Sequence, residues 1–259
     1  MQGPDLALLH KAALAAGEIA ERHFRTDIQT WTKDRDDSPV TAADLEIDAM
    51  LRDQLLGARP GYGWLSEETE DSTARLDQDT VFIIDPIDGT RSFIAGESNF
   101  SHSLAIAHRG VVQAAVVHLP MKSRTYLAER GQGTFLNGER VSASARGALE
   151  GADILTAKAS LADTFWSAGT PPAFNRHFRP SLAYRLALVA EGRFDAMMTL
   201  RPTWEWDVAA GVLLCEEAGA TVSDQHGAAP LFNNPHPKLP GLLAGSQGVH
   251  AQTRLALAD

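Results

Sequence analysis

One short segment in the first half of the chain combines two groups that phosphate chemistry needs. Residues 85–90, D-P-I-D-G-T, place Asp85 and Asp88 three positions apart after the apolar run 81–84. Hard divalent cations prefer such carboxylate oxygens, and the amides of Gly89 and Thr90, expected to open a short helix, can donate to a phosphate. The pattern predicts a cation that bridges carboxylates and phosphate oxygens, as phosphoryl transfer requires. The hexapeptide fits equally well a turn whose aspartates cap backbone amides.

Three other segments carry carboxylates that could join this site, and each has a structural alternative. Glu67 and Glu68 precede the apolar run, and adjacent glutamates also suit a solvated loop. Asp207 stands at the start of an expected helix, where capping is the ordinary role. Thr41 and Asp44 have the T-x-x-D spacing of a capping box. Taken singly, none of these segments decides between metal binding and local structure.

The elements that must position these residues follow from hydrophobic periodicity and turn signals. We expect helices at 4–24, 41–56, 181–191, 207–218 and the C-terminal end, and strands at 81–84, 103–107, 111–119, 125–128, 133–136, 194–199, 220–223 and 242–244. Antiparallel strands in the first half and alternating elements in the second predict layered helices and sheets, α+β grading into α/β. The small, polar stretch 142–152 predicts a boundary between two halves, residues 1–150 and 151–259, of one catalytic unit.

Bulk composition narrows the range of partners. A chain of 259 residues with 44% hydrophobic content can bury one large core or two closely associated ones. Its formal charge of −10 argues against a nucleic-acid polymer as partner, although it allows a small phosphorylated substrate. No apolar run approaches the roughly 20 residues that cross a bilayer, and from the first eleven residues we expect no secretion signal. Cys215 is the single cysteine, so we expect no internal disulfide and a cytoplasmic location.

The ligand chemistry of the acidic segments favours magnesium. An all-oxygen set without cysteine or histidine suits Mg²⁺, with Mn²⁺ as a substitute. None of the nine histidines has H-x-H or H-x-x-x-H spacing. His102, His108 and His118 lie in or beside expected strands, where we expect structural roles.

Taken together and in this order, the segments resemble the lithium-sensitive, magnesium-dependent phosphatases that include inositol monophosphatases and CysQ-type 3′(2′),5′-bisphosphate nucleotidases. The resemblance covers nearly the whole chain. It rests on the glutamate pair at 67–68, D-P-I-D-G-T at 85–90, F-L-N-G at 135–138, W-D-V-A-A-G at 206–211 and E-A-G at 217–219. It implies a layered α-β-α-β-α sandwich, of the inositol monophosphatase and fructose-1,6-bisphosphatase type, with the site between its halves.

The same resemblance implies a set of metal ligands. Glu67 and Asp85, with the main-chain carbonyl of Ile87, would hold a first ion. Asp85, Asp88 and Asp207 would hold a second, in a site of two or three ions. Glu67 would therefore be both a metal ligand and a catalytic residue.

It also implies catalytic and phosphate-binding roles. Thr90 and Asp44 would orient and deprotonate the attacking water, which makes the capping box compatible with catalysis. Asp88 and the amides of Gly89 and Thr90 would bind the phosphate. The nucleophile would be a metal-activated water, so Cys215 would take no part.

The residues expected around the substrate resemble two different groups within the family. Inositol monophosphatases typically carry a glutamate seven positions before the W-D aspartate, and here that position is Leu200. Segments 38–44, 181–185 and 202–207 look more like CysQ-type enzymes. Arg185 could contact the second phosphate of adenosine 3′,5′-bisphosphate, or it could be an ordinary helix arginine. We expect Lys33 to be a further substrate contact.

The resemblance therefore favours a bisphosphate nucleotidase. Inositol 1-phosphate is the alternative substrate. The D-P-I-D-G-T segment continues here with Arg91 and Ser92, as it does more often in inositol and histidinol phosphatases than in CysQ-type enzymes. Histidinol phosphate and sugar bisphosphates also fit the metal-binding pattern. A regulatory protein on the same fold, binding transcription machinery, is the non-enzymatic alternative, and a homodimer would be typical of the family.

Overall fold

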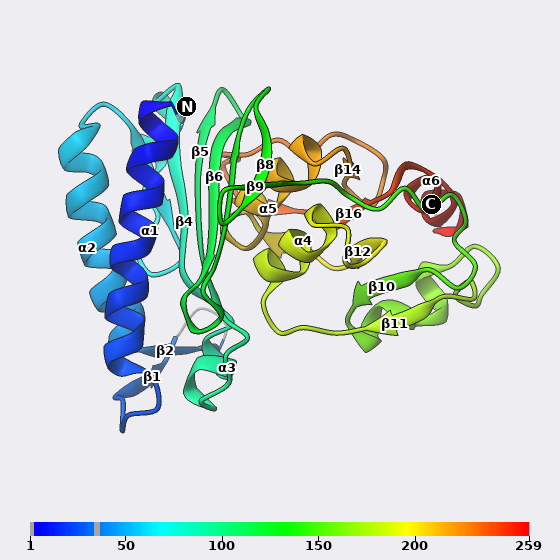
Figure 1. Cartoon of the computed structure of the whole chain (residues 1–259), viewed down its shortest axis with the longest axis horizontal. Helices are drawn as coiled ribbons and strands as arrows, with labels where there is room; N and C mark the ends of the chain where they lie inside the picture. The colour runs from blue at the N-terminus through cyan, green and yellow to red at the C-terminus, as the bar shows by residue number, and fades with distance from the viewer. Residues whose placement is uncertain (1–2, 34–36, 259) are drawn as a thin grey trace.

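The computed structural model describes residues 3–33 and 37–258, and Figure 1 shows them as alternating layers of helix and sheet. Helices α1 (Pro4–His23) and α2 (Ala42–Ala58) cover the outer face of a seven-stranded sheet. Helices α4 (Leu182–Ala190) and α5 (Glu205–Glu217) lie between this sheet and a five-stranded sheet. Helix α6 (Gln247–Ala256) packs on the far face of the second sheet. The predicted α-β-α-β-α sandwich is confirmed.

The seven-stranded sheet has the order β3-β4-β5-β6-β7-β8-β9. Its strands are β3 (Gly63–Ser66), β4 (Thr80–Asp88), β5 (Ser101–His108), β6 (Val111–Leu119), β7 (Arg124–Glu129), β8 (Gly133–Leu136) and β9 (Glu139–Val141). The predicted hairpin between β5 and β6 is confirmed, and its turn residues Arg109 and Gly110 have the two positive φ angles of a tight hairpin turn. The antiparallel strands expected in the first half are joined at one edge by β3, which was not predicted and which pairs parallel with β4.

The five-stranded sheet has the order β11-β10-β12-β16-β14. It contains β10 (Asp153–Thr156), β11 (Asn175–His177), β12 (Ala196–Thr199), β14 (Thr221–Ser223) and β16 (Leu242–Gly245). Strand β10 runs parallel to β11 and β12, whereas β16 is antiparallel to β12 and β14. Strands β10 and β11 were not predicted, and β12 begins two residues later than expected.

Smaller elements complete the chain. They are the strand pairs β1 (Thr30–Thr32) with β2 (Pro39–Thr41) and β13 (Thr203–Trp204) with β15 (Lys238–Leu239), the short helix α3 (Thr90–Ile94), and the 3-10 turns Thr73–Asp77, Pro120–Lys122, Lys158–Leu161 and Asp163–Phe165. Within residues 3–33 and 37–258, no helix has the length and apolar character needed to span a membrane.

Close helix packing in the central layer depends on a small residue. A Cβ atom added to Gly211 of α5 would lie 2.4 Å from Leu186 Cδ1 of α4. A larger side chain would therefore push the two helices apart, at the cost that overpacked cores show. The seven-stranded sheet lies before residue 150 and the five-stranded sheet after it. The division into two halves stays a prediction.

Candidate metal and phosphate site

The end of β4 differs from the sequence-based expectation. The strand does not stop at Asp85 but continues to Asp88. Asp85 pairs with Ser103 and Asp88 with Ser101, so β4 carries one extra residue at this point. Such a bulge tolerates Pro86 because the extra residue makes no ladder bond.

A buried histidine contacts this bulge. The carbonyl oxygen of Pro86 lies 2.5 Å from Nδ1 of His102, and Nε2 of the same ring has no hydrogen-bond partner among the described residues. Burial lowers the pKa of His102 to about 3. The ring is therefore neutral, and Nδ1 carries the proton that it donates to Pro86. The expected structural role of His102 is consistent with this contact, although the sequence did not indicate its partner.

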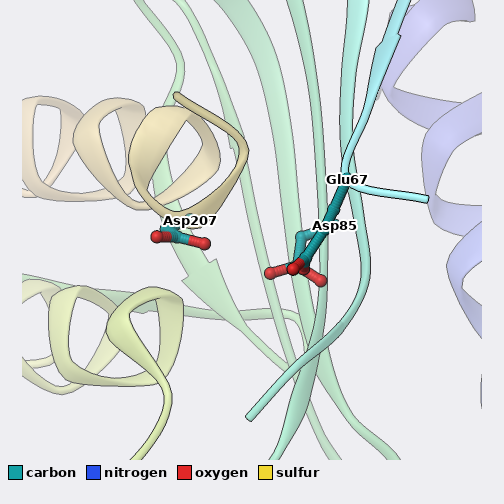
Figure 2. A group of neighbouring side chains, drawn as sticks. All are labelled: Glu67, Asp85 and Asp207. Atoms are coloured by element: carbon teal, nitrogen blue, oxygen red, sulfur yellow. The ribbon is translucent and has the colours of Figure 1, made fainter. Parts of the chain in front are cut away.

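Three carboxylates from separate elements converge beside the bulge. Glu67 directly follows β3, Asp85 lies on β4, and Asp207 lies in the first turn of α5, as Figure 2 shows. One carboxylate oxygen from each lies within 4.8 Å of the other two. The parallel pairing of β3 with β4 brings Glu67 next to Asp85, and the helix start brings Asp207 from the other half of the chain.

The start of α5 corrects a second expectation. The helix begins at Glu205, two residues earlier than predicted, so Asp207 is not its N-cap residue. The buried carboxylate of Glu205 accepts hydrogen bonds from the backbone amides of Asn233 and Asn234, at 2.6 and 2.9 Å. The Thr203 hydroxyl donates to Asp207 Oδ2 at 3.3 Å. The side chain of Asp207 is therefore not used for helix capping and can join Glu67 and Asp85 in binding a cation.

The electrostatics of the group favour a bound cation. Asp85 is 1% exposed, and its Oδ1 has no hydrogen-bond partner among the described residues. Burial, and then the charges of Glu67, Asp88 and Asp207, raise the pKa of Asp85 well above its ordinary range. The pKa of Asp207 is raised in the same way by burial and then by Asp88 and Glu67. A hard divalent cation such as Mg²⁺ fits this all-oxygen donor set and would relieve the repulsion.

Lys33 brings a positive charge to this acidic group. Its Nζ lies 2.8 Å from Glu67 Oε1 and 2.6 Å from Glu68 Oε1. Burial raises the pKa of Glu68 to about 8, with Glu67 as the next cause. Glu68 is thus a buried member of the acidic group, which sequence reasoning missed because adjacent glutamates also suit a surface loop. The role of Lys33 as a substrate contact stays a prediction.

Asp88 lies beside the three converging carboxylates but outside their 4.8 Å group. Its Oδ2 accepts hydrogen bonds from the Ser181 hydroxyl and the Ala183 amide, both at 2.6 Å. Burial outweighs these bonds and raises the pKa of Asp88 to about 6. Asp88 therefore joins the bulge to the start of α4, and its metal-binding role stays a prediction. Ser181, expected to be the first residue of the helix at 181–191, is instead the N-cap of α4, and sequence reasoning did not recognise it as a site residue.

The two residues expected to handle the attacking water come from two helix starts, Asp44 from α2 and Thr90 from α3. The predicted capping box is confirmed: Asp44 Oδ2 accepts from the Thr41 amide at 2.8 Å, and the Asp44 amide donates to the Thr41 hydroxyl. The Thr90 hydroxyl lies 3.4 Å from Asp44 Oδ1 and 3.1 Å from the Ile87 carbonyl. Burial raises the pKa of Asp44 to about 6. A carboxylate with this pKa is suited to accept a proton near neutral pH.

A cavity of about 450 Å³ opens over these residues. Glu67, Asp88, Gly89, Thr90 and Asp207 line one side of it. Gly89 has a φ of +102°, and an added Cβ would lie 3.2 Å from the Asn99 carbonyl oxygen. Glycine is therefore required at the point where the backbone meets the cavity. The remaining wall includes Phe165, Phe178, Pro180, Leu182, Leu200, Arg91, Arg185 and Arg201.

The structure gives Arg185 features of both roles considered for it, a substrate contact and an ordinary helix arginine. It lines the cavity, yet it is only 5% exposed, and its Nε donates to the Arg179 carbonyl at 2.5 Å. Its guanidinium lies over the Phe178 ring at 4.5 Å. Burial lowers the pKa of Arg185 to about 10, so the group stays charged at neutral pH. The hydrogen bond to Arg179 and the contact with the Phe178 ring support the wall segment 178–180. Contact of Arg185 with a second phosphate stays a prediction.

Comparisons with known proteins agree with this geometry. Residues 2–259 match the inositol monophosphatase family. The chain is 36% identical to the inositol-1-monophosphatase of Rhizobium meliloti (strain 1021) over 233 residues, 86% of each chain. It is 35% identical to the Nus factor SuhB of Escherichia coli (strain K12) over 232 residues, 85% of each. The crystal structure of the extragenic suppressor protein suhB from Bartonella henselae matches with a TM-score of 0.83 and 29% identity, over 98% of each chain. The chain therefore belongs to the inositol monophosphatase family of magnesium-dependent phosphatases.

Proposed function

We propose that this phosphatase hydrolyses a small phosphate monoester that carries a flat ring and a second anionic group, with adenosine 3′,5′-bisphosphate as the first candidate. The observation that carries the phosphatase assignment is the convergence of Glu67, Asp85 and Asp207 beside the cavity. Magnesium ions held there, two or three in number and replaceable by Mn²⁺, would offset the charge of the phosphoryl oxygens and acidify a water molecule.

The protein groups around the cavity perform the remaining tasks. The amides of Gly89 and Thr90 donate to phosphate oxygens. The Thr90 hydroxyl, 3.4 Å from Asp44 Oδ1, orients the attacking water, and Asp44 takes up its proton. The pKa of Asp44, about 6, leaves it largely ionised at neutral pH. No protein side chain forms a bond to phosphorus in this scheme.

The substrate assignment rests on the composition of the cavity wall. Leu200 cannot accept a hydrogen bond from a ring hydroxyl, which argues against a cyclitol. Phe178 is 46% exposed and lines the cavity, so its face can stack on a flat base. Arg91, Arg185 and Arg201 line the same cavity, and guanidinium groups bind phosphate through parallel hydrogen bonds.

Inositol 1-phosphate is the second candidate. It is favoured by the relative from Rhizobium meliloti, whose name is inositol-1-monophosphatase. Histidinol phosphate and sugar phosphates belong on the same substrate panel. The deciding measurement is kcat/KM for each ester with Mg²⁺ under one set of conditions. We expect adenosine 3′,5′-bisphosphate to be preferred over inositol 1-phosphate, and a tenfold preference in the opposite direction would overturn the assignment.

A binding role without catalysis is the third candidate, and the name Nus factor of the relative from Escherichia coli favours it. Phosphate release from the substrate panel, with and without EDTA, separates this role from an enzyme. We expect release that EDTA abolishes. Asp207→Asn should remove the activity, while Asp53→Asn, at an exposed position of α2, serves as the matched control. Absence of release from every ester, with a folded protein, would favour the binding role.

A further inference from the structure

A second pocket adjoins the substrate cavity. Its volume is about 780 Å³, and it shares the wall residues Phe178 and Pro180 with that cavity. We call it the basic pocket, because four of its lining residues are cationic. The complete lining is Glu97, Asn99, Lys122, Arg124, Phe178, Arg179, Pro180, Tyr184 and Arg193. This concentration of positive charge stands out in a chain whose formal charge is −10.

Separate parts of the fold bring the four cations together. Lys122 ends the 3-10 turn after β6, and Arg124 begins β7. Arg179 precedes α4, and Arg193 follows it. Because the segments 122–124 and 179–193 are distant in sequence, tertiary packing brings the two halves of the cluster together.

Most of this charge is not neutralised by protein carboxylates. Arg124 pairs with Glu191, whereas Lys122 Nζ donates to the Ser98 hydroxyl at 3.2 Å. In the part of the chain that the structure describes, Lys122, Arg179 and Arg193 form no ion pair. Among the described residues, Glu97 is the carboxylate in the lining, and Glu191 is the one paired with a lining cation. Four cations against these two carboxylates leave an excess of two positive charges.

Repulsion within the cluster affects Lys122 directly. Burial, and then the charges of Arg179, Arg193 and Arg124, lower the pKa of Lys122. An anion between these side chains would replace repulsion by attraction. Guanidinium groups match the geometry of phosphate oxygens, and an ammonium adds a point charge.

We propose that the basic pocket binds a phosphate-type anion, either the distal phosphate of the substrate or a free phosphate-bearing ligand. The wall that separates it from the substrate cavity is the segment 178–180, which Arg185 supports through the Arg179 carbonyl and the Phe178 ring. A ligand in the basic pocket therefore contacts the reverse side of a substrate-cavity wall. Binding of a free anion does not depend on the substrate assignment above.

Binding is tested with inorganic pyrophosphate by titration calorimetry on the whole protein in EDTA, which prevents phosphate binding through metal ions. We expect one site whose affinity falls as salt is raised. The double substitution Lys122→Gln with Arg193→Gln should weaken binding at least tenfold. Arg52→Gln, at an exposed position of α2, should leave it unchanged. Arg193→Gln alone, also at an exposed position, is a milder variant, and thermal unfolding of each variant shows whether it is folded.

Kinetics then distinguish the two sources of the anion. If the distal phosphate of the substrate occupies the pocket, the double variant raises KM for adenosine 3′,5′-bisphosphate and not for p-nitrophenyl phosphate. If a free ligand occupies it, KM for both esters is unchanged and the response of kcat to added pyrophosphate is lost. Either result supports the site. Equal pyrophosphate affinity in wild type and double variant would overturn it, and a changed sedimentation coefficient with unchanged affinity would identify a contact between protein chains.

Discussion

Replacement of Asp207 by asparagine should stabilise the metal-free protein while it destroys the metal site. Asparagine has the same shape, and its side-chain oxygen can still accept the hydrogen bond from Thr203. The change removes a negative charge from a group whose oxygens lie within 4.8 Å of one another. Point substitutions usually destabilise a protein, so a gain in stability would be diagnostic of repulsion between the carboxylates.

The size of the effect follows from Coulomb's law. Two unit charges 4.8 Å apart repel by about 3 kcal/mol at an effective dielectric constant of about 20. Asp207 has two such neighbours, Glu67 and Asp85, but Lys33 offsets part of the charge of Glu67. The raised pKa values of Asp85 and Asp207 also favour their protonated forms, which weakens the repulsion. We therefore expect a net gain of about 1–3 kcal/mol, or about 2–4 °C in Tm for each kcal/mol in a chain of this size.

The assay is thermal unfolding in EDTA and in excess Mg²⁺, for wild type and Asp207→Asn. A ligand at 100 times its Kd adds about 2.7 kcal/mol of stability, so Mg²⁺ should raise Tm in the wild type and not in the variant. Turnover should fall more than about a hundredfold, since even supporting residues around a metal contribute 10–100-fold.

The pH dependence supplies an independent check. The folded-state pKa values of Asp85 and Asp207 lie above the unfolded value of 3.8. Their protonated forms therefore contribute stability that is fully present below pH 3.8 and is lost as pH rises through the folded-state values. Metal-free wild type should lose Tm as pH rises above 3.8, and Asp207→Asn should lose less. A variant that is less stable than wild type in EDTA at pH 8, or that keeps the Mg²⁺-induced rise in Tm, would refute the reasoning.

Four further outcomes are expected. His102→Val leaves the buried Pro86 carbonyl without its donor, which should cost about 1–3 kcal/mol in thermal unfolding and raise the Mg²⁺ concentration for half-maximal activity. His102→Asn, which keeps a donor near Nδ1, should restore the Mg²⁺ dependence; no rescue would assign the residue to packing alone. Leu200→Glu should raise the ratio of kcat/KM for inositol 1-phosphate to that for adenosine 3′,5′-bisphosphate, and a constant ratio would exclude Leu200 from selectivity. kcat/KM should fall as pH drops below about 6, where Asp44 takes up a proton and ceases to act as a base; a pH-independent rate from pH 5 to 7 would remove it from that role. Cys215→Ala should change kcat less than twofold, because the thiol is buried in the core and burial raises its pKa; a larger loss with a folded protein would contradict a water nucleophile.

Features encoded by neighbouring residues could be predicted well. The capping box of Thr41 and Asp44 uses groups three positions apart, and the hairpin at 103–119 needs only a tight turn between two apolar runs. The same holds for the long helix at 4–23, whose buried residues recur at helical spacing. Layered helices and sheets were also predicted from the order of the elements, whereas the α-β-α-β-α sandwich was predicted through family resemblance.

Features that depend on a partner in another element were predicted poorly. Strand β4 continues past Pro86 because the bulge and His102 of the neighbouring strand accommodate the proline. Strands β10 and β11 were missed, since short strands acquire their pairing from a sheet assembled across the chain. The sequence did not indicate that Glu68 is buried against Lys33 or that Ser181 contacts Asp88.

The sequence by itself determined which carboxylates are available, the local geometry of the helix starts, and an oxygen-only ligand chemistry. The tertiary structure decided which carboxylates meet, how burial and mutual repulsion raise their pKa values, and that four cations from two distant segments surround a second pocket. The physical reason is the separation in sequence of the groups that interact. Capping and turn formation depend on groups that are only a few residues apart. The approach of Asp207 to Asp85 follows instead from burying the inner faces of two sheets against the same pair of helices.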